Sequence, residues 1–542
     1  MRLINVNTME LESFMGTPPE YAILSHTWEE EEVTFQDFLQ PSIATEKKGY
    51  SKIEHTCGQA RKDHLSYAWV DTCCIDKTSS SELSEAINSM YAWYASAKKA
   101  YAFLADLAPE SPADADSLAN CRWFTRGWTL QELIAPPNVS FFDSSWILRG
   151  SKISMIRTLA TVTDIEQSVL KDASILPSIP VARRMSWAAN RITTRVEDIA
   201  YCLLGIFDVN IPLLYGENEK AFIRLQEAIM KEVNDLTLFA WRSYDEPREH
   251  HRGIFARCPQ EFADAGKITF NSQASFSEDF LLTNKGVRID AGLAEEHDVL
   301  SLDCFIPLDG GGVFKHQLGI YLQMHGSGVY ARVKPWRFAR SSHMWRPGKF
   351  SAIYISKVLS KSLTLSLSAG ELYRGAFNFG RGFVSQHFQV MWTEPKNLWD
   401  AKWNMFLTQG MPAFTGAVFF SPAKQPGALM LKDPFLLVCG ISPRTRKPWV
   451  MLSSGTHNAD VFSAARDLPR LSELARERCQ ARDMEMMDLF GNYKIKVTVS
   501  LSQITFQGVL VHSIDLDYIQ PHQVDSDPED IGTLFDPYVR NA

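Results

Sequence analysis

Four short apolar runs punctuate the first 150 residues and constrain the fold more than any other feature. They are Tyr21–Ser25, Tyr67–Asp71, Ala100–Leu104 and Val139–Phe142. Such runs are typical of strands buried on both faces of a sheet. The stretches between them predict helices over Tyr50–His64, Glu82–Lys98 and from Thr129 to Ala135. Because repeated strand–helix–strand units join by right-handed crossovers, we predict an α/β domain over residues 1–150, with a parallel, doubly wound sheet and helices on both faces.

The pattern changes twice after residue 150. Residues 151–240 are expected to form a helical extension, with Val196–Phe207 and Glu219–Val233 as its clearest amphipathic stretches. Beyond it, short strand-like runs are broken by Gly, Pro and Asn, which predicts a β-rich domain over residues 241–520, compatible with one large sandwich. Residues 521–542 contain the acidic run DSDPED and are expected to be a mobile tail.

Composition excludes several classes of protein. The 542 residues carry a net charge of −8 and no Lys/Arg run, so nucleic acid is not an expected partner. No window approaches the roughly 18 to 20 apolar residues of a membrane helix. Nine scattered cysteines without CxxC spacing suggest reduced thiols rather than disulfides or a zinc site. We therefore expect a cytoplasmic protein without a membrane span or a bound metal.

Polar residues follow the first two predicted strands at the point where each strand ends. Ligands of open parallel sheets bind outside these carboxyl ends. The RGWTLQEL segment, residues 126–133, should reach the same edge, with Trp128 and Glu132 four apart on one helical face. The residues expected to converge on one crevice are Ser25, His26, Trp28, Asp71, Arg126, Trp128 and Glu132.

Structural roles compete with functional ones at several of these positions. The spacing Thr129 to Glu132 also fits a capping box, in which the glutamate bonds back to the first residue of a helix. His26 could be bonded to a neighbouring backbone group, and Asp71 could cap its loop. A different enzyme class would use Cys73 or Cys74 as a nucleophile, activated by His26 or His64.

Three sequence blocks carry a family resemblance. YAILSHTW (residues 21–28), YAWVDTCCIDK (67–77) and RGWTLQELIAP (126–136) resemble the signature blocks of fungal heterokaryon-incompatibility (HET) domains, and the resemblance extends through residues 186–217. HET domains are considered distant relatives of TIR domains. The resemblance implies a TIR-like, that is flavodoxin-like, fold and a role in vegetative incompatibility, innate immunity and regulated cell death.

The TIR relationship also implies an activity, because many TIR domains cleave NAD. Their catalytic glutamate lies in a WCxxEL-like helix segment, and WTLQEL here places that role on Glu132, with Thr129 where TIR domains commonly have cysteine. We therefore expect an NAD glycohydrolase in which Glu132 is catalytic and Ser25, His26, Trp28, Asp71, Arg126 and Trp128 hold NAD or a related nucleotide, as substrate rather than cofactor. Self-association through the HET domain is expected to gate it.

A non-enzymatic alternative remains open at this point. The HET domain would then signal by homotypic association, and the β-rich domain would recognise a protein partner. The geometry of Glu132 distinguishes the two. A side chain that points into an open crevice favours the enzyme, and one folded onto the amide of Thr129 favours the signalling module.

Overall fold

The computed structural model describes most of the chain and divides it into two compact units. Unit 1 comprises Met1–Gln323 and Ala331–Leu359, and unit 2 comprises Met324–Tyr330 and Ser360–Ala542. The residues described are 1–244, 250–270, 279–294, 298–307, 315–326, 328–345, 350–368, 373–380, 388–401, 403–408, 411–422, 433–455, 459–478, 483–487, 493–506 and 509–523. The end of the predicted acidic tail, residues 524–542, lies outside them.

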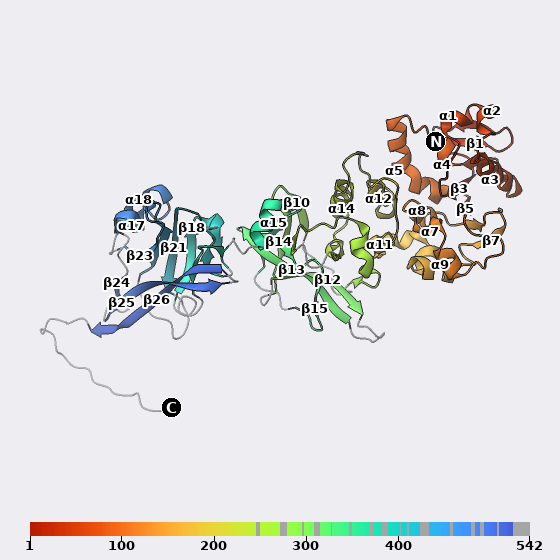
Figure 1. Cartoon of the computed structure of the whole chain (residues 1–542). Helices are drawn as coiled ribbons and strands as arrows, with labels where there is room; N and C mark the ends of the chain where they lie inside the picture. Colours follow the sequence, from red (N-terminus) through yellow and green to blue (C-terminus); the bar gives the residue numbers. More distant parts are fainter. Residues whose placement is uncertain are drawn as a thin grey trace. The chain divides into compact units, whose positions relative to one another are not determined.

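A seven-stranded sheet forms the centre of residues 1–151, in the order β2-β1-β4-β3-β5-β6-β7 (Figure 1). Its strands are β1 Arg2–Asn5, β2 Glu10–Ser13, β3 Tyr21–His26, β4 Tyr67–Trp69, β5 Lys99–Phe103, β6 Val139–Phe142 and β7 Leu148–Ser151. Strand β3 runs parallel to β4 and β5, and β5 runs parallel to β6. The four predicted strands are thus confirmed as parallel neighbours. Their spatial order, second-first-third-fourth along the chain, is that of flavodoxin-like doubly wound sheets.

The sequence did not reveal the three antiparallel strands of the sheet, of which β2 and β7 form the two edges. Strand β1 pairs with β2 and β4, and β7 pairs with β6. Strands β2 and β7 contain no fully buried residue. A short, partly exposed edge strand lacks the apolar run by which a buried strand is recognised, which explains the omission.

Helices cover both faces of this sheet, as predicted. Helix α3 (Tyr50–Lys62) contacts β3 and β4, whereas α5 (Ser80–Ser96) contacts α8 (Thr129–Ile134). Figure 1 shows α3 and α5 on opposite sides of the strands. The buried face of α5 carries Ile87, Met90 and Tyr94, the apolar spacing of an amphipathic helix. Shorter helices complete the domain: α1 Phe35–Phe38, α2 Pro41–Ala44, α4 Asp71–Cys74, α6 Ala115–Ala119 and α7 Arg122–Thr125.

The helical extension is joined to the sheet domain through backbone hydrogen bonds. Gly127 N donates to the Ile192 carbonyl at 2.8 Å, and Ile192 N donates to the Thr125 carbonyl at 2.7 Å. A Cβ on Gly127 would lie 2.6 Å from Thr193 Cγ2, so the close approach depends on glycine. The elements of the extension are α9 Ile156–Thr163, α10 Gln167–Lys171, η1 Ala173–Ser178, α11 Val181–Ser186, α12 Asp198–Tyr201, α13 Leu204–Phe207, α14 Lys220–Glu232 and η2 Leu236–Phe239.

A nine-stranded sheet follows in the sequence. Its path is β10-β11-β16-β14-β13-β12-β9, with β15 paired to β13 and β8 paired to β14. Strands β10 and β11 form an antiparallel hairpin. The elements are β8 His251–Arg252, η3 Pro259–Ala265, β9 Thr269–Phe270, β10 Phe280–Thr283, β11 Gly286–Ala291, β12 Val299–Pro307, β13 Lys315–Gly326, β14 Val329–Val333, β15 Ala339–Ser341 and β16 Ser351–Ile355.

Unit 2 contains two sheets packed face to face. The six-stranded sheet has the order β19-β20-β17-β26-β25-β24 and the four-stranded sheet the order β18-β21-β22-β23. Phe377, Phe406 and Val497 of the first sheet share a buried core with Phe420 and Phe435 of the second. The elements are α15 Lys361–Ser368, β17 Phe377–Phe379, β18 Phe388–Glu394, η5 Lys396–Leu398, β19 Trp399–Asp400, β20 Met405–Phe406, β21 Phe414–Pro422, β22 Phe435–Ile441, β23 Pro448–Ser454, α17 Ala459–Ser463, α18 Leu468–Arg478, β24 Asp483–Met487, β25 Tyr493–Phe506 and β26 Val509–Gln523.

The structure therefore divides the predicted β-rich region differently from the expected range of 241–520. The region is rich in strands, but its first sheet lies mainly in unit 1, and the sandwich belongs to unit 2. Short-strand patterning alone does not show where one core ends and the next begins. Among the described residues, no helix has both the length and the apolar character that crossing a membrane requires.

Candidate functional site

A cavity of about 280 Å³ opens beside the carboxyl ends of β3 and β4, and we call it the Glu132 cavity. Six of the seven predicted site residues line it, namely His26, Trp28, Asp71, Arg126, Trp128 and Glu132. Ser25, the seventh, is fully buried and hydrogen-bonds to Glu132. The residues predicted at the strand ends and in the RGWTLQEL segment thus lie in or beside one cavity.

Glu132 is held in this cavity by the end of β3. It lies in the short helix α8 and accepts a hydrogen bond from the Ser25 hydroxyl. Trp123 Nε1 in turn donates to Ser25 Oγ at 2.8 Å. Burial raises the pKa of Glu132 to about 8, against the opposing effect of the Ser25 hydrogen bond. A carboxyl group that titrates near neutral pH in a cavity has the properties of a functional acid or base.

The capping-box alternative for Glu132 is not found. Helix α8 has Trp128 as its N-cap residue, and no side chain caps it. The Thr129 hydroxyl donates to the Arg126 carbonyl at 2.9 Å and accepts from Arg191 at 2.9 Å. The spacing Thr129 to Glu132 therefore does not reflect reciprocal capping, and the Glu132 carboxylate faces Ser25 instead.

His26 is buried between two carboxylates. Its side chain is 1% exposed, with Nε2 at 3.7 Å from Glu32 and Nδ1 at 3.9 Å from Asp71. Neither ring nitrogen has a hydrogen-bond partner among the described residues. The backbone hydrogen bond of the structural alternative is therefore absent in that part of the chain. Two unpartnered ring nitrogens beside a cavity can serve a ligand as donor or acceptor.

Asp71 fixes the indole of Trp28 at the mouth of the cavity. It is the first residue of α4 and accepts a hydrogen bond from Trp28 Nε1 at 2.8 Å. Trp28 is 41% exposed, and Lys77 Nζ lies 3.4 Å from its ring centroid. The indole is thus an oriented, partly open aromatic plate, which suits stacking against a planar ring.

The remaining lining comes from two places. Helix α5 and the segment before it supply Ile75, Lys77, Leu83, Ile87 and Met90, and the helical extension supplies Thr194, Arg195, Asp198 and Tyr215. None of these was predicted as a site residue. The family resemblance could have indicated some of them, because Lys77 ends the second signature block and the extension residues lie within the stretch 186–217 that the resemblance also covers. Strand-end reasoning could not find them, since they follow no parallel strand.

The structure does not support the cysteine-nucleophile alternative. Cys73 and Cys74 are buried, and burial raises the pKa of the Cys73 thiol well above its ordinary value. Both thiols hydrogen-bond to the Val70 backbone, with Cys74 Sγ accepting from Val70 N at 3.4 Å and Cys73 Sγ donating to the Val70 carbonyl. A buried thiol of raised pKa carries little thiolate and is a poor nucleophile.

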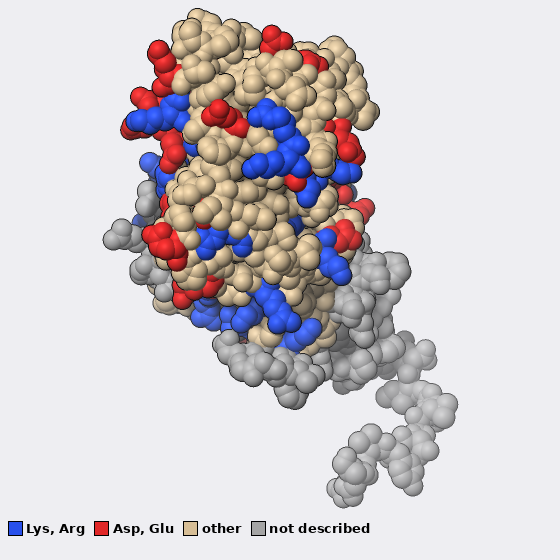
Figure 2. Space-filling view, turned by 90° about the vertical axis from the view of Figure 1, so that its right-hand side faces the viewer, with Lys and Arg blue, Asp and Glu red and all other residues tan. Residues whose placement is uncertain are grey.

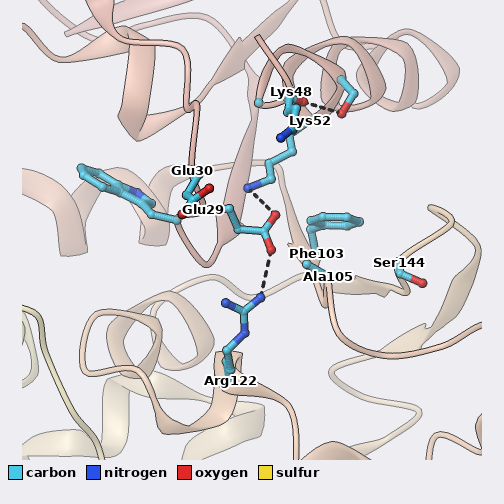
Figure 3. A pocket seen from close by; sticks show the side chains of 11 residues that line it. Glu29, Glu30, Lys48, Lys52, Phe103, Ala105, Arg122 and Ser144 are labelled. Carbon is cyan, nitrogen blue, oxygen red and sulfur yellow. Dashed lines mark hydrogen bonds and ion pairs between the residues drawn. The ribbon is translucent and has the colours of Figure 1, made fainter.

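A second cavity, of about 790 Å³, is also lined by Trp28, and we call it the Glu29 cavity. Figure 3 shows Glu29 between Lys52 and Arg122, which reach it from opposite sides. Arg122 lies 2.9 Å and Lys52 3.3 Å from the carboxylate. Lys48, at the rim, pairs with Glu31 at 3.3 Å. The cations of this cavity are therefore already neutralised by carboxylates of the chain.

Positive and negative side chains are mixed on one face of the molecule. On the face drawn in Figure 2, Lys and Arg side chains are interspersed with Asp and Glu. The pattern on that face is unlike the single-sign stripe with which proteins grip a phosphate backbone.

Comparisons with known proteins agree with the signature blocks. The family model for the heterokaryon incompatibility protein (HET) matches residues 21–120, and a domain of unknown function (DUF8212) matches residues 220–288. A vegetative incompatibility protein of Podospora anserina, HET-E-1, is 49% identical over 226 residues, which are 40% of this chain and 16% of the relative. The chain thus covers a small part of that relative's length. No solved structure matches. The N-terminal part of this chain is a heterokaryon-incompatibility domain, and the chain is a HET-domain protein.

Proposed function

We propose that the Glu132 cavity binds NAD or a related nucleotide and hydrolyses the N-glycosidic bond between nicotinamide and ribose. In this proposal the HET domain is TIR-like, and the reaction serves an incompatibility response that ends in cell death. The proposed role in an incompatibility response rests on the similarity of the chain to a vegetative incompatibility protein.

One observation carries the catalytic assignment. Glu132 lines the cavity, is held by Ser25 and does not cap its own helix. This is the arrangement expected of the enzyme rather than of the signalling module. The strand order agrees, because the ends of parallel strands in a doubly wound sheet are the usual place for a nucleotide.

The reaction needs a buried negative charge at the ribose. As the bond from C1′ to the nicotinamide nitrogen breaks, its electron pair leaves with nicotinamide, and the ribose acquires oxocarbenium character. Ionised Glu132 stabilises that charge in a site of low dielectric. Water then adds at C1′ and loses a proton, which gives ADP-ribose, nicotinamide and one proton. The indole of Trp28, oriented by Asp71, offers a plate for a base ring.

Turnover of NAD by the full-length chain is the direct test. NAD consumption should be followed over a range of protein concentrations, since self-association is expected to gate activity. Glu132→Gln should abolish turnover, whereas Glu54→Gln, which changes an exposed glutamate on α3, should not. If the concentrated wild-type protein releases no nicotinamide while toxicity in cells persists in Glu132→Gln, the non-enzymatic alternative replaces the proposal.

A further inference from the structure

Three cations that line the Glu132 cavity lie against aromatic rings rather than in close ion pairs. They are Lys77, Arg126 and Arg195. None of them forms an ion pair within 4.0 Å with a carboxylate of the described residues. Each lies against an aromatic ring instead. Lys77 and Arg126 face Trp28, at 3.4 and 6.0 Å from its ring centroid, and Arg195 faces Tyr215 at 4.4 Å. The rings position the cations without neutralising them.

The carboxylates of the same cavity are occupied by uncharged donors. Asp71 accepts from the Trp28 indole, and Glu132 accepts from Ser25. Asp198 accepts from the Tyr215 hydroxyl at 3.0 Å. The cations therefore remain available to a ligand, although acidic groups share the cavity with them.

The neighbouring Glu29 cavity shows the opposite arrangement. Its Lys48, Lys52 and Arg122 are all paired with glutamates of the chain. Because both cavities border Trp28, they provide a comparison within one domain. Lys77 is partly buried, and an unpaired charge away from water is costly. Burial accordingly lowers the pKa of the Lys77 ammonium group.

We infer that Lys77, Arg126 and Arg195 bind the diphosphate of a nucleotide in the Glu132 cavity. The inference rests on the proposed function and names the part of the ligand that these residues recognise. Two guanidinium groups and one ammonium group suit a group that carries two negative charges and several acceptor oxygens. His26 and Asp71, which also line the cavity, are then left to the ribose.

Arg195 makes the helical extension part of this site. The extension is held beside α8 by the Ile192 backbone and by Arg191, which donates to the Arg126 carbonyl at 2.8 Å. The same segment thus fixes the backbone of Arg126 and supplies Arg195. Recognition of the diphosphate accordingly requires residues beyond the predicted 1–150 domain.

Binding of ADP-ribose to the full-length protein tests this directly, because ADP-ribose contains the diphosphate and has no nicotinamide bond to cleave. Calorimetric titration should show binding by the wild-type protein that weakens as salt is raised. Arg195→Ala and Lys77→Ala should each weaken it about tenfold or more, the loss of one charge-assisted contact. Adenosine, which lacks phosphate, should bind equally to all variants. Arg157→Ala, a change at an exposed arginine outside the cavity, is the matched control.

The outcomes separate this inference from the proposed activity. If ADP-ribose does not bind at millimolar concentration, or binds equally to Arg195→Ala and the wild type, the diphosphate site is wrong. If ADP-ribose binds through these cations but NAD is not cleaved, the site stands and the hydrolysis falls. Should Lys77→Ala melt below the assay temperature, Arg195→Ala decides alone, because Arg195 is exposed and its loss leaves the core unchanged.

Discussion

Ser25 and Glu132, which are 107 positions apart, are joined by a buried hydrogen bond from the serine hydroxyl to the glutamate carboxylate. The indole of Trp123 donates to the same serine oxygen. This short chain of donors connects the end of β3 to α8 and orients a carboxyl group that would otherwise rotate freely. Because a hydrogen bond to the charged form favours ionisation, Ser25 also opposes the effect of burial on Glu132.

The first prediction concerns Glu132 itself. Glu132→Gln keeps the size of the side chain and an oxygen that can accept from Ser25, so the protein should stay folded. NAD turnover should nevertheless fall on the order of 100-fold or more, because the charge that stabilises the ribose is lost. Glu132→Ala should in addition destabilise the fold by about 1–3 kcal/mol, since the buried Ser25 hydroxyl loses its acceptor. Turnover and thermal melting of both variants check this, and a fully active Glu132→Gln would contradict it.

The second prediction concerns the pH dependence of stability. Burial raises the pKa of Glu132 from its ordinary value of 4.5 to about 8. Between these values the unfolded chain has released the proton and the folded chain retains it, so this group makes the protein less stable as pH rises. Glu132→Gln has no ionisable group at this position, so it lacks this decrease in stability with rising pH. The melting temperature of the variant minus that of the wild type should therefore increase from pH 5 to pH 8, and a constant difference would argue against the raised pKa.

The third prediction concerns Ser25 as a positioning residue. Ser25→Ala removes the hydrogen bond that favours ionised Glu132, so the pKa of Glu132 should rise further above about 8. The rise of kcat/KM with pH, which reports the free enzyme, should shift to higher pH. At sufficiently alkaline pH the variant should recover much of its activity. A uniform loss at every pH would mean that Ser25 contacts the substrate directly.

The fourth prediction concerns the junction between the HET domain and the helical extension. A Cβ on Gly127 would lie 2.6 Å from Thr193 Cγ2 and 3.1 Å from Cys202 Sγ. Gly127→Ala should therefore destabilise the protein by about 1–3 kcal/mol, as overpacking does. Gly16→Ala is the control, because no atom lies within 4 Å of its added Cβ. Chemical denaturation of both variants measures the difference, and equal midpoints would show that the junction can relax.

The parallel strands and the rim of the site could be predicted because each leaves a local signal. Strands β3 to β6 are continuous apolar runs, and the polar residues that follow them must lie at one edge of the sheet. His26 and Asp71 were found in this way. Arg195 and Tyr215 could not be, because they reach the cavity only through the docking of the extension, a contact between distant segments that no periodicity records.

The β-rich region shows a second limit of prediction from the sequence. Its strands could be recognised one by one, yet the division between units 1 and 2 depends on which apolar faces pack together. Phe420 and Phe435 share a core with Phe377, a pairing of faces that local sequence does not specify. The edge strands β2 and β7 were missed for the opposite reason, since they bury too little to show a pattern.

The backbone hydrogen bonds of residue 192 with residues 125 and 127 restrict where recombination can separate this domain from the rest of the chain. A recombination event that joined the first 150 residues to a foreign partner would transfer a sheet with one wall of its cavity missing. The smallest segment that carries a complete cavity runs to at least Tyr215. Gene fusions that preserve function should therefore place their joints after that point, and the 226-residue length of the match to the Podospora protein is long enough to include such a segment.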